Sequence, residues 1–281
     1  MSALSIVVAI GGIPASRYDD DEATDLHPAG GGSGGSVGKT IVITGAGAGL
    51  GRALAQRFAS EGETVILLGR TLSKVQALAD ELGAPAMAVE CDVSDPASVR
   101  TAFTQIAGTH PKIDILINNA GIYEPFTVAE ATDEQISGII DTNLKGPIYC
   151  CRAAIPMMEK GGLIINVGSE SIAVPFVMLS LYQSSKAGLE MFTTALEAEL
   201  EEAGIRVALL RAGPMYDEAK SAPGWDRDAA MRFHVGCAKK GLDLQARPVS
   251  HSASATGIFR AVIDLPADVR VSHVSIGARR A

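Results

Sequence analysis

From Lys39 onwards, short apolar runs alternate with longer stretches in which apolar residues recur every three or four positions. The apolar runs are rich in Val, Ile and Leu, which is typical of strands buried on both faces of a parallel sheet. The longer stretches have the period of helices that cover such a sheet. The predicted strands are 40–44, 64–68, 86–90, 113–117, 162–167, 205–210 and 269–276.

Helix-start signals mark several of the intervening segments. Asp95 followed by Pro96 is a favourable cap with proline in the first turn, and residues 132–135 (T-D-E-Q) form a capping box that opens a long helix towards Glu159. The other predicted helices are 50–60, 72–82, 182–203 and 253–264. Residues 214–243 have no sustained period, so we expect an irregular segment with short helices at most.

This alternation predicts an α/β fold of the doubly wound, Rossmann type. Its mostly parallel seven-stranded sheet should have helices on both faces and form a single domain, with ligands at the carboxyl ends of the strands. We expect residues 38–281 to make up this domain.

Residues 1–37 differ from the rest of the chain. An apolar stretch is followed by an acidic run and then by a Gly/Ser-rich linker at 30–36. No Lys or Arg precedes the apolar stretch, as a secretory signal would normally require. We therefore expect a non-targeting extension that is disordered, and a signal peptide is the alternative.

Composition and charge exclude several classes of function. The net charge of −8 leaves no basic footprint, so no nucleic-acid partner is expected. No apolar run has the ~18 residues of a membrane span. Cys91, Cys150, Cys151 and Cys237 include no C-x-x-C pair, so we expect no metal site and reduced thiols in a cytoplasmic protein.

Tyr182 and Lys186 are the first candidates for chemistry. They are four residues apart, so on a helix they share one face. An ammonium beside a phenol lowers the pKa of the phenol by charge attraction, which favours proton exchange nearer to neutral pH. Ser169, upstream, can supply a hydroxyl for a substrate oxygen.

A glycine-rich turn follows the first predicted strand. Glycines allow a pyrophosphate to approach the backbone, and the following helix N-terminus favours its charge. The G-x-G-x-x-G pattern does not fit, whereas T-G-x-x-x-G-x-G does, with residues Thr44, Gly45, Gly49, Leu50 and Gly51. A tight turn without a ligand is the alternative.

Together with these motifs, Asn118-Asn119-Ala120-Gly121 after the fourth strand and Asn143 in N-L-K-G complete a pattern. From about Lys39 to the C-terminus, the chain resembles the short-chain dehydrogenases/reductases. The resemblance rests on the order and spacing of the glycine turn, the N-N-A-G motif, and the Asn, Ser, Tyr and Lys positions.

The resemblance implies a role for each matching residue. Tyr182 is then the general acid in carbonyl reduction and the base in alcohol oxidation, and Lys186 lowers its pKa and binds the nicotinamide ribose. Ser169 orients the substrate oxygen, Asn143 holds a water of the proton relay, and Asn118 bonds across the sheet. Further cofactor contacts are implied for Asp92, Asn119, Ala120, Gly121 and Gly213. Structural roles in strand ends, helices or loops are the alternatives for Asn118, Asn143 and Asp92.

The end of the second strand indicates the nucleotide. Gly69 stands where an acidic residue would bind the ribose 2′-hydroxyl of NAD, and Arg70 follows it. A guanidinium suits a 2′-phosphate, which predicts NADP(H) as cofactor, unless Arg70 is merely a surface residue.

The chain departs from the family pattern after the sixth strand. Ala212 replaces a proline before Gly213, and Asp217 stands where a nicotinamide-contacting threonine is usual. Residues 214–243 are expected to form a substrate lid whose acidic and basic side chains balance, so no charged substrate is favoured. We expect its apolar residues Met215, Trp225, Met231 and Phe233 to line the pocket, and His234 to be a surface or packing residue.

The sequence therefore predicts an NADP(H)-dependent oxidoreductase that interconverts a ketone or aldehyde with its alcohol. The resemblance also suggests a homodimer or homotetramer. The alternatives are a non-catalytic nucleotide sensor, suggested by the altered region from Ala212 to Asp217, and a dehydration or epimerisation on the same scaffold.

Overall fold

A computed structural model describes residues 38–217, 224–266 and 268–279. Its main sheet has the strand order β3–β2–β1–β4–β5–β6–β9, and every neighbouring pair is parallel. This confirms the predicted seven-stranded, doubly wound fold in one domain. The strands are β1 (Thr40–Thr44), β2 (Thr64–Gly69), β3 (Met87–Glu90), β4 (Ile115–Asn118), β5 (Leu163–Ser169), β6 (Arg206–Ala212) and β9 (His273–Ile276).

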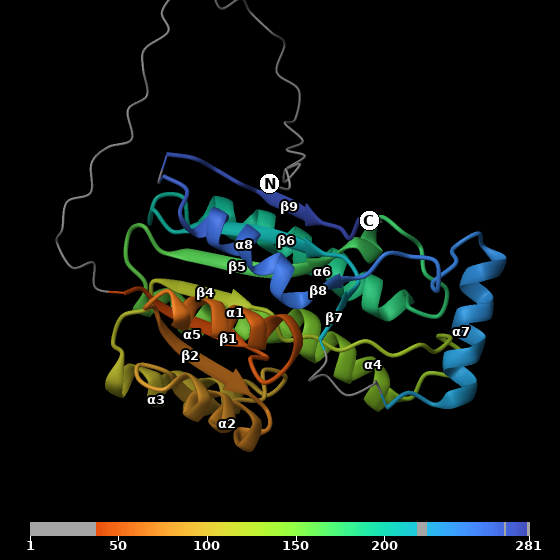
Figure 1. Ribbon diagram of the computed structural model, residues 1–281, viewed down its shortest axis with the longest axis horizontal. Helices are drawn as coiled ribbons and strands as arrows, with labels where there is room; N and C mark the ends of the chain where they lie inside the picture. Colours follow the sequence, from red (N-terminus) through yellow and green to blue (C-terminus); the bar gives the residue numbers. More distant parts are fainter. Residues whose placement is uncertain (1–37, 218–223, 267, 280–281) are drawn as a thin grey trace, which may run out of the picture.

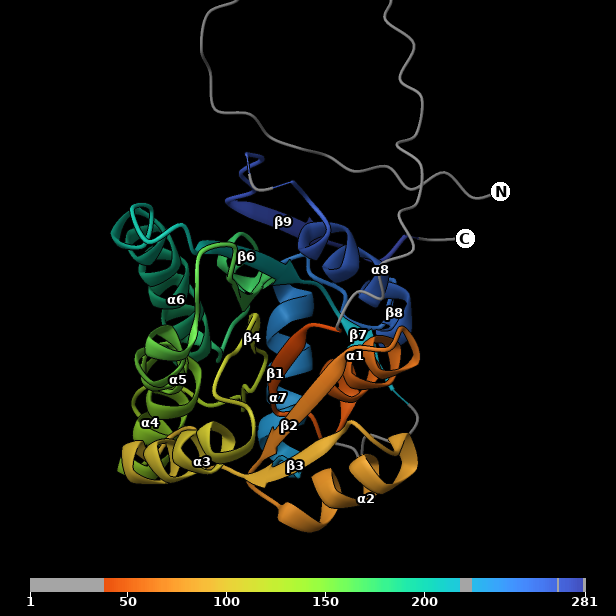
Figure 2. The same cartoon turned by 90° about the vertical axis from the view of Figure 1, so that its left-hand side faces the viewer.

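Helices cover both faces of the sheet (Figures 1 and 2). One layer is formed by α1 (Gly49–Ser60), α2 (Leu72–Leu82) and α8 (Ser252–Ile263). The opposite layer is formed by α3 (Pro96–Thr109), α4 (Asp133–Ile140), α5 (Gly146–Ala154) and α6 (Ser180–Glu199). None of the described helices combines the length and the apolar character that a membrane-spanning helix needs.

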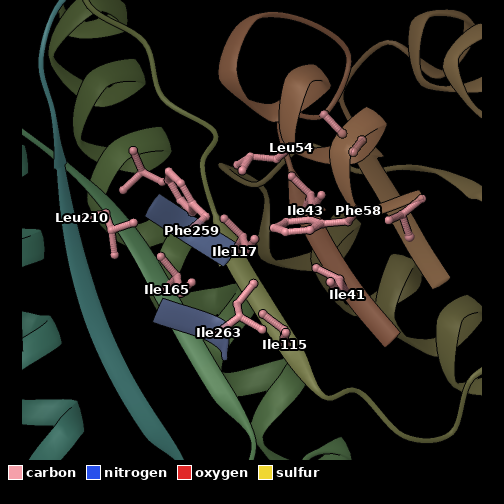
Figure 3. Close-up of a cluster of buried hydrophobic side chains, with 14 of the residues drawn as sticks. Ile41, Ile43, Leu54, Phe58, Ile115, Ile117, Ile165, Leu210, Phe259 and Ile263 are labelled. Carbon is pink, nitrogen blue, oxygen red and sulfur yellow. The ribbon is translucent and has the colours of Figure 1, made fainter. Parts of the chain in front are cut away.

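The core is packed on both sides of the central strands because their side chains point alternately to the two faces. In β1, Ile41 and Ile43 face α1 and α8, whereas Val42 faces the other layer. Figure 3 shows the first of these clusters, in which Phe58 of α1 and Phe259 of α8 lie against the strands. Each such fully buried side chain contributes roughly 1.5–3 kcal/mol.

The expected helix starts are present. Asp95 accepts hydrogen bonds from the amides of Ala97 (2.9 Å) and Ser98 (3.2 Å). Thr132 and Gln135 form the reciprocal capping box of α4. The long helix predicted from Thr132 is not uniform, however, because a π-helical turn at Asp141–Lys145 separates α4 from α5.

Two segments differ from the sequence prediction. The last strand is shorter than predicted and covers only His273–Ile276. Within 214–243, a strand β7 (Met215–Tyr216) pairs with β8 (Ser250–His251), and a full helix, α7 (Arg227–Lys239), follows. Asp226 caps the N-terminus of α7. Only Phe233 and Cys237 of this helix are buried, which explains why the sequence shows a weak apolar period there. The expected extension at 1–37 lies outside the described residues.

Candidate active site

Two adjoining cavities lie at the carboxyl ends of the central strands, where a doubly wound sheet places its ligands. The glycine-turn cavity, of about 280 Å³, is lined mainly by the ends of β1, β2, β3 and β4. The tyrosine cavity, of about 420 Å³, is lined by the ends of β5 and β6, by α6 and by α7. Asn119 and Gly121 line both, so the two cavities adjoin at these residues.

The predicted residues divide between the two cavities. Those in the glycine-turn cavity are Gly45, Arg70, Asp92, Asn119, Ala120 and Gly121. Those in the tyrosine cavity are Leu50, Asn119, Gly121, Ser169, Tyr182, Lys186 and Gly213. Four predicted residues line neither cavity: Thr44, Gly49, Gly51 and Asn143. The side chains of Thr44 and Asn143 instead hydrogen-bond to the loop after β4.

The glycine turn is shaped by close backbone contact. Gly45 has a φ of +66°, in the region that favours glycine. A Cβ on Gly51 would lie 2.4 Å from the carbonyl oxygen of Gly45, so the first turn of α1 can approach β1 only with glycine there. Ala48, the N-cap residue of α1, provides no side-chain acceptor for the first amides of the helix. These amides are therefore suited to an anionic group in the cavity.

Thr44 and Asn119 fix the turn to the loop after β4. The hydroxyl of Thr44 accepts hydrogen bonds from the amides of Asn119 and Ala120, both at 3.0 Å. In return, the side-chain amide of Asn119 donates to the carbonyl of Thr44 at 2.9 Å. The two motifs read separately from the sequence are therefore one hydrogen-bonded unit.

Arg70 and Asp92 lie in the glycine-turn cavity beyond the turn itself. Arg70 is exposed and adjoins Gly69, the last residue of β2. Gly69 has no room for a side chain, because a Cβ there would lie 2.7 Å from Cγ1 of Val75. Asp92 accepts hydrogen bonds from the amide and the hydroxyl of Ser94, so one carboxylate oxygen stabilises the local turn.

Ser169, Tyr182 and Lys186 meet in the tyrosine cavity. Ser169 ends β5, and its side chain hydrogen-bonds to the phenol of Tyr182 near the start of α6. Lys186 lies one helical turn further, is only 4% exposed, and donates to the carbonyl of Val167 at 2.8 Å. The spacing predicted from the sequence thus gives one polar cluster.

The pKa of Tyr182 differs from the expectation. Burial raises it, and the hydrogen bond with Ser169 only partly opposes this effect. Burial also lowers the pKa of Lys186, to about 8. Because the Lys186 ammonium is directed to the carbonyl of Val167, the lowering of the phenol pKa that the four-residue spacing predicts is not found.

Asn143 lies in the π-helical turn and is fully buried. Its side-chain oxygen accepts from the amide of Ile122 at 2.8 Å, and its nitrogen donates to the carbonyl of Ile122 at 2.8 Å and to the hydroxyl of Ser185 at 3.1 Å. π-Helical turns inside α-helices are frequent at functional sites. Here the turn places the side chain of Asn143 against Ile122, in the loop after β4 that lines both cavities.

Asn118 does bond across the sheet, and its partners extend a network that the sequence did not reveal. Its amide donates to Asn166 of β5 at 2.8 Å, and Asn166 donates to Thr193 of α6 at 2.9 Å. All three are buried. The network fixes β4, β5 and α6 behind Tyr182 and Lys186.

An aromatic wall closes one side of the tyrosine cavity. The ring of Tyr123 lies 5.5 Å from that of Tyr182 and 5.2 Å from that of Trp225, and Trp225 is followed by Phe233 at 6.0 Å. Trp225 also donates to the backbone carbonyl of Tyr123 at 3.1 Å.

The expectation for the lid residues is correct for three of the four. Met215, Trp225 and Phe233 line the tyrosine cavity. The prediction for Met231 is wrong, because this residue is 62% exposed and does not line the cavity. His234, expected to pack or face solvent, lies at the cavity wall, with its ring 5.7 Å from that of Phe233.

Gly213 lies where β6 passes the end of β9. Its amide donates a hydrogen bond to the carbonyl oxygen of Ile276 at 2.7 Å. A Cβ at position 213 would lie 2.7 Å from the same oxygen, so only glycine fits there. The backbone of this altered segment is therefore fixed at the edge of the tyrosine cavity.

A third hollow, of about 240 Å³, lies at the opposite ends of β5 and β6. It is lined by residues such as Leu163, Arg206 and Glu197. Since Ser169 ends β5 at the other end of the strand, this hollow is separate from the polar cluster around Tyr182.

Comparison with known proteins decides the family. The family model described as short chain dehydrogenase matches residues 39–223. The chain is a short-chain dehydrogenase/reductase. Members of this family are oxidoreductases that use a nicotinamide cofactor, and this is the class of activity to which the chain belongs.

Individual relatives agree with this membership. The chain is 32% identical over 241 residues to the "NADP-dependent 3-hydroxy acid dehydrogenase YdfG" of Salmonella typhi, covering 84% of this chain and 93% of that protein. It is 36% identical over 172 residues to a "3beta-hydroxysteroid dehydrogenase" of Mediterraneibacter gnavus, covering 59% of this chain and 62% of that protein. The crystal structure of serine dehydrogenase from Escherichia coli superimposes with a TM-score of 0.67 at 27% identity, covering 84% of this chain and 96% of that one.

The glycine-turn cavity fits a nicotinamide dinucleotide. The close approach of Gly51 to Gly45, the uncapped amides of α1 and the guanidinium of Arg70 together suit a phosphate-bearing ligand. Because the two cavities adjoin at Asn119 and Gly121, a ligand that extends past these residues would approach Tyr182.

Proposed function

We propose that this short-chain dehydrogenase/reductase interconverts a ketone or aldehyde with its alcohol by hydride transfer to or from NADP(H), with Tyr182 as the general acid and base. The observation that carries the proposal is the polar cluster in the tyrosine cavity. Ser169 and Tyr182 hydrogen-bond to each other there, beside the buried Lys186, in a cavity that adjoins the one that fits the nucleotide.

When bound, the nicotinamide would supply or accept the hydride. Ser169 would orient the carbonyl oxygen, and Tyr182 would donate the proton that this oxygen gains. Because burial raises the pKa of Tyr182, the phenol is protonated at neutral pH and is ready to act as the acid. In the oxidative direction Tyr182 must first lose that proton, so oxidation should increase with pH.

Asn143 and Lys186 support this proton transfer. Asn143 fixes the backbone of Ile122 next to the cluster, and Lys186 supplies a buried positive charge at the end of β5. The positioning of a relay water by Asn143 and the binding of the ribose by Lys186 are part of the proposal.

The preference for NADP(H) rests on Arg70 and on the missing carboxylate at Gly69. Arg70 lies exposed in the glycine-turn cavity, where a 2′-phosphate could pair with its guanidinium. An acidic side chain at Gly69 would require Val75 to move, because a Cβ there would lie 2.7 Å from Cγ1 of Val75. One relative, YdfG, is NADP-dependent by its name.

We further propose a cytoplasmic homodimer or homotetramer packed through the helices of the α4–α6 layer. Met191 of α6 is 69% exposed, as expected for a residue that another subunit covers. All four cysteines are free thiols and buried, which suits a reducing compartment.

The direct test is Tyr182→Phe, with Tyr149→Phe as the matched control outside both cavities. We expect Tyr182→Phe to lower kcat at least ~10²-fold, as the loss of a general acid does, while NADPH affinity stays within severalfold. Tyr149→Phe should keep full activity.

Full turnover by Tyr182→Phe would refute the assignment. NADPH binding by the wild-type protein without turnover of any carbonyl compound would favour the nucleotide sensor. Turnover with only catalytic amounts of cofactor would favour dehydration or epimerisation.

A further inference from the structure

The charges that face the tyrosine cavity come from outside the lid. Among the described residues of 214–243, no Asp, Glu, Lys or Arg side chain lines this cavity, and His234 is the one titratable side chain that does. The charged side chains that do line it are Glu170, Lys186 and Arg247. With Lys186 protonated, as it is below pH about 8, these sum to one positive charge in a protein whose net charge is −8. The equal numbers of acidic and basic side chains counted in residues 214–243 therefore do not describe the net charge of the tyrosine cavity.

Arg247 is held rigidly in the cavity wall. Its Nη2 donates to Glu170 at 2.7 Å, and its guanidinium carbon lies 5.3 Å from the centre of the Phe176 ring. The side chain is 21% exposed. Among the described residues, Nε and Nη1 have no hydrogen-bond partner. A guanidinium presents several N–H donors in a fixed plane. Glu170 and Phe176 therefore fix the orientation of the whole group, while the N–H groups of Nε and Nη1 stay available to a ligand.

Arg247 also lies near the reacting end of the cavity. Its partner Glu170 directly follows Ser169 in the chain, and the carboxylate of Glu170 acts on Tyr182 through its charge. Arg247 lines the same cavity as Ser169 and Tyr182, so one molecule bound there can present a group to Arg247 and a carbonyl carbon to Ser169 and Tyr182. The aromatic wall on the other side would accept the apolar remainder of the molecule.

We propose that Arg247 binds the carboxylate of the substrate, so that the substrates of this site are oxo acids and the corresponding hydroxy acids with an apolar chain. This inference rests on the proposed carbonyl reduction and specifies its substrate class. Glu170 holds the guanidinium in place, and its own negative charge limits how tightly an acid binds. Arg247 is thus a specificity-determining residue.

The test compares an acid with its neutral ester. Reduction of 3-oxohexanoate and of methyl 3-oxohexanoate by NADPH is measured with the wild-type protein, Arg247→Met and Arg232→Met. Arg232 is the matched control, since it forms a similar ion pair with Glu130 (2.9 Å) but does not line the cavity.

We expect Arg247→Met to lower kcat/KM for the acid by about ten- to a hundredfold, mainly through KM, as for the loss of a charge-assisted hydrogen bond. The ester should change by less than about threefold. Arg232→Met should affect both substrates equally. Glu170→Gln should lower KM for the acid, because it removes the nearby negative charge. Equal losses for acid and ester in Arg247→Met would overturn the proposal and leave the carbonyl reduction intact.

A binding measurement separates this inference from the proposed reaction. Trp225 is the only tryptophan of the chain and lines the cavity, so its fluorescence reports occupancy. Hexanoate should bind more tightly than hexanamide, and the difference should disappear in Arg247→Met. If neither oxo compound is reduced but this difference is found, the carboxylate site stands and the proposed reaction fails. If hexanoate and hexanamide bind alike in the wild-type protein, the carboxylate site is refuted whatever the kinetics.

Discussion

Lys186 is predicted to cost stability, and replacing it should make the protein more stable. The side chain is only 4% exposed, and burial depresses its pKa from 10.5 to about 8. A depression of this size corresponds to about 3 kcal/mol of unfavourable free energy for holding the charged form in the folded protein. In Lys186→Met this term disappears, and the hydrogen bond to the carbonyl of Val167, worth about 1–2 kcal/mol, is lost with it. We therefore expect a net gain of about 1–2 kcal/mol at pH 7 together with a loss of activity.

The sign of the pH dependence follows from the same values. Below pH 8 Lys186 is protonated in both states, and the unfavourable term is fully present. Between pH 8 and 10.5 the unfolded chain binds more protons at this side chain than the folded protein does, so the wild type gains stability as pH rises. By pH 10 about 2 kcal/mol of the difference should be regained, and the advantage of Lys186→Met should vanish or reverse.

Urea unfolding of the wild type and of Lys186→Met at pH 7 and pH 10, at one protein concentration, measures both effects. The exposed Lys240 is the control, since Lys240→Met should change stability by less than about 0.5 kcal/mol at either pH. A less stable Lys186→Met at pH 7, or a difference that does not depend on pH, would refute the reasoning.

Three further outcomes follow from the geometry. Replacing Arg70 with Gln should reduce the preference for NADPH over NADH in kcat/KM by about ten- to a hundredfold. Adding Gly69→Asp should invert this preference, but only if Val75→Ala is also made, because Val75 otherwise occupies the space of the new side chain. Paired kinetics with both cofactors would check this, and equal use of the two by the wild type would contradict it. Gly51→Ala should weaken NADPH binding at least ~10-fold in a titration and lower the free energy of unfolding by about 1–3 kcal/mol, since its Cβ meets a backbone oxygen that cannot move aside. Asn166→Leu should destabilise the protein by about 1–3 kcal/mol in urea, because the buried amide of Asn118 loses its oxygen acceptor and keeps only the sulfur of Cys151 at 3.4 Å. An unchanged unfolding midpoint would show that the network is dispensable.

Much of the fold was predictable from local pattern. Apolar runs such as 64–68 specify strands buried on both faces, and the capping box at Thr132 fixes a helix start without help from distant residues. The length of the last strand was overestimated. Val269 and Val271 suggest a strand, but only His273–Ile276 pairs with β6. Helix α7 was missed because only a narrow face, with Phe233 and Cys237, is buried.

The site was predictable only in part, because several of its features arise from the fold. The order of Asn143, Ser169, Tyr182 and Lys186 in the chain indicates the cluster. The π-helical turn that directs Asn143 inwards has no local sequence signal. Asn166, within an apolar strand, reads as an ordinary buried position until Asn118 and Thr193 are placed beside it. The same holds for Arg247, which reaches the cavity from a segment that the sequence links to no motif and meets Glu170, 77 positions away.

Transfer of the label from NADPH deuterated at C4 of the nicotinamide tests the central claim most directly. Both C4 diastereomers should be offered with a panel of oxo acids, their esters and simple ketones, and the products analysed by mass spectrometry. The account predicts deuterium on the new carbinol carbon from one of the two diastereomers, with no such product from Tyr182→Phe. Products without deuterium, or undiminished label transfer by Tyr182→Phe, would contradict it.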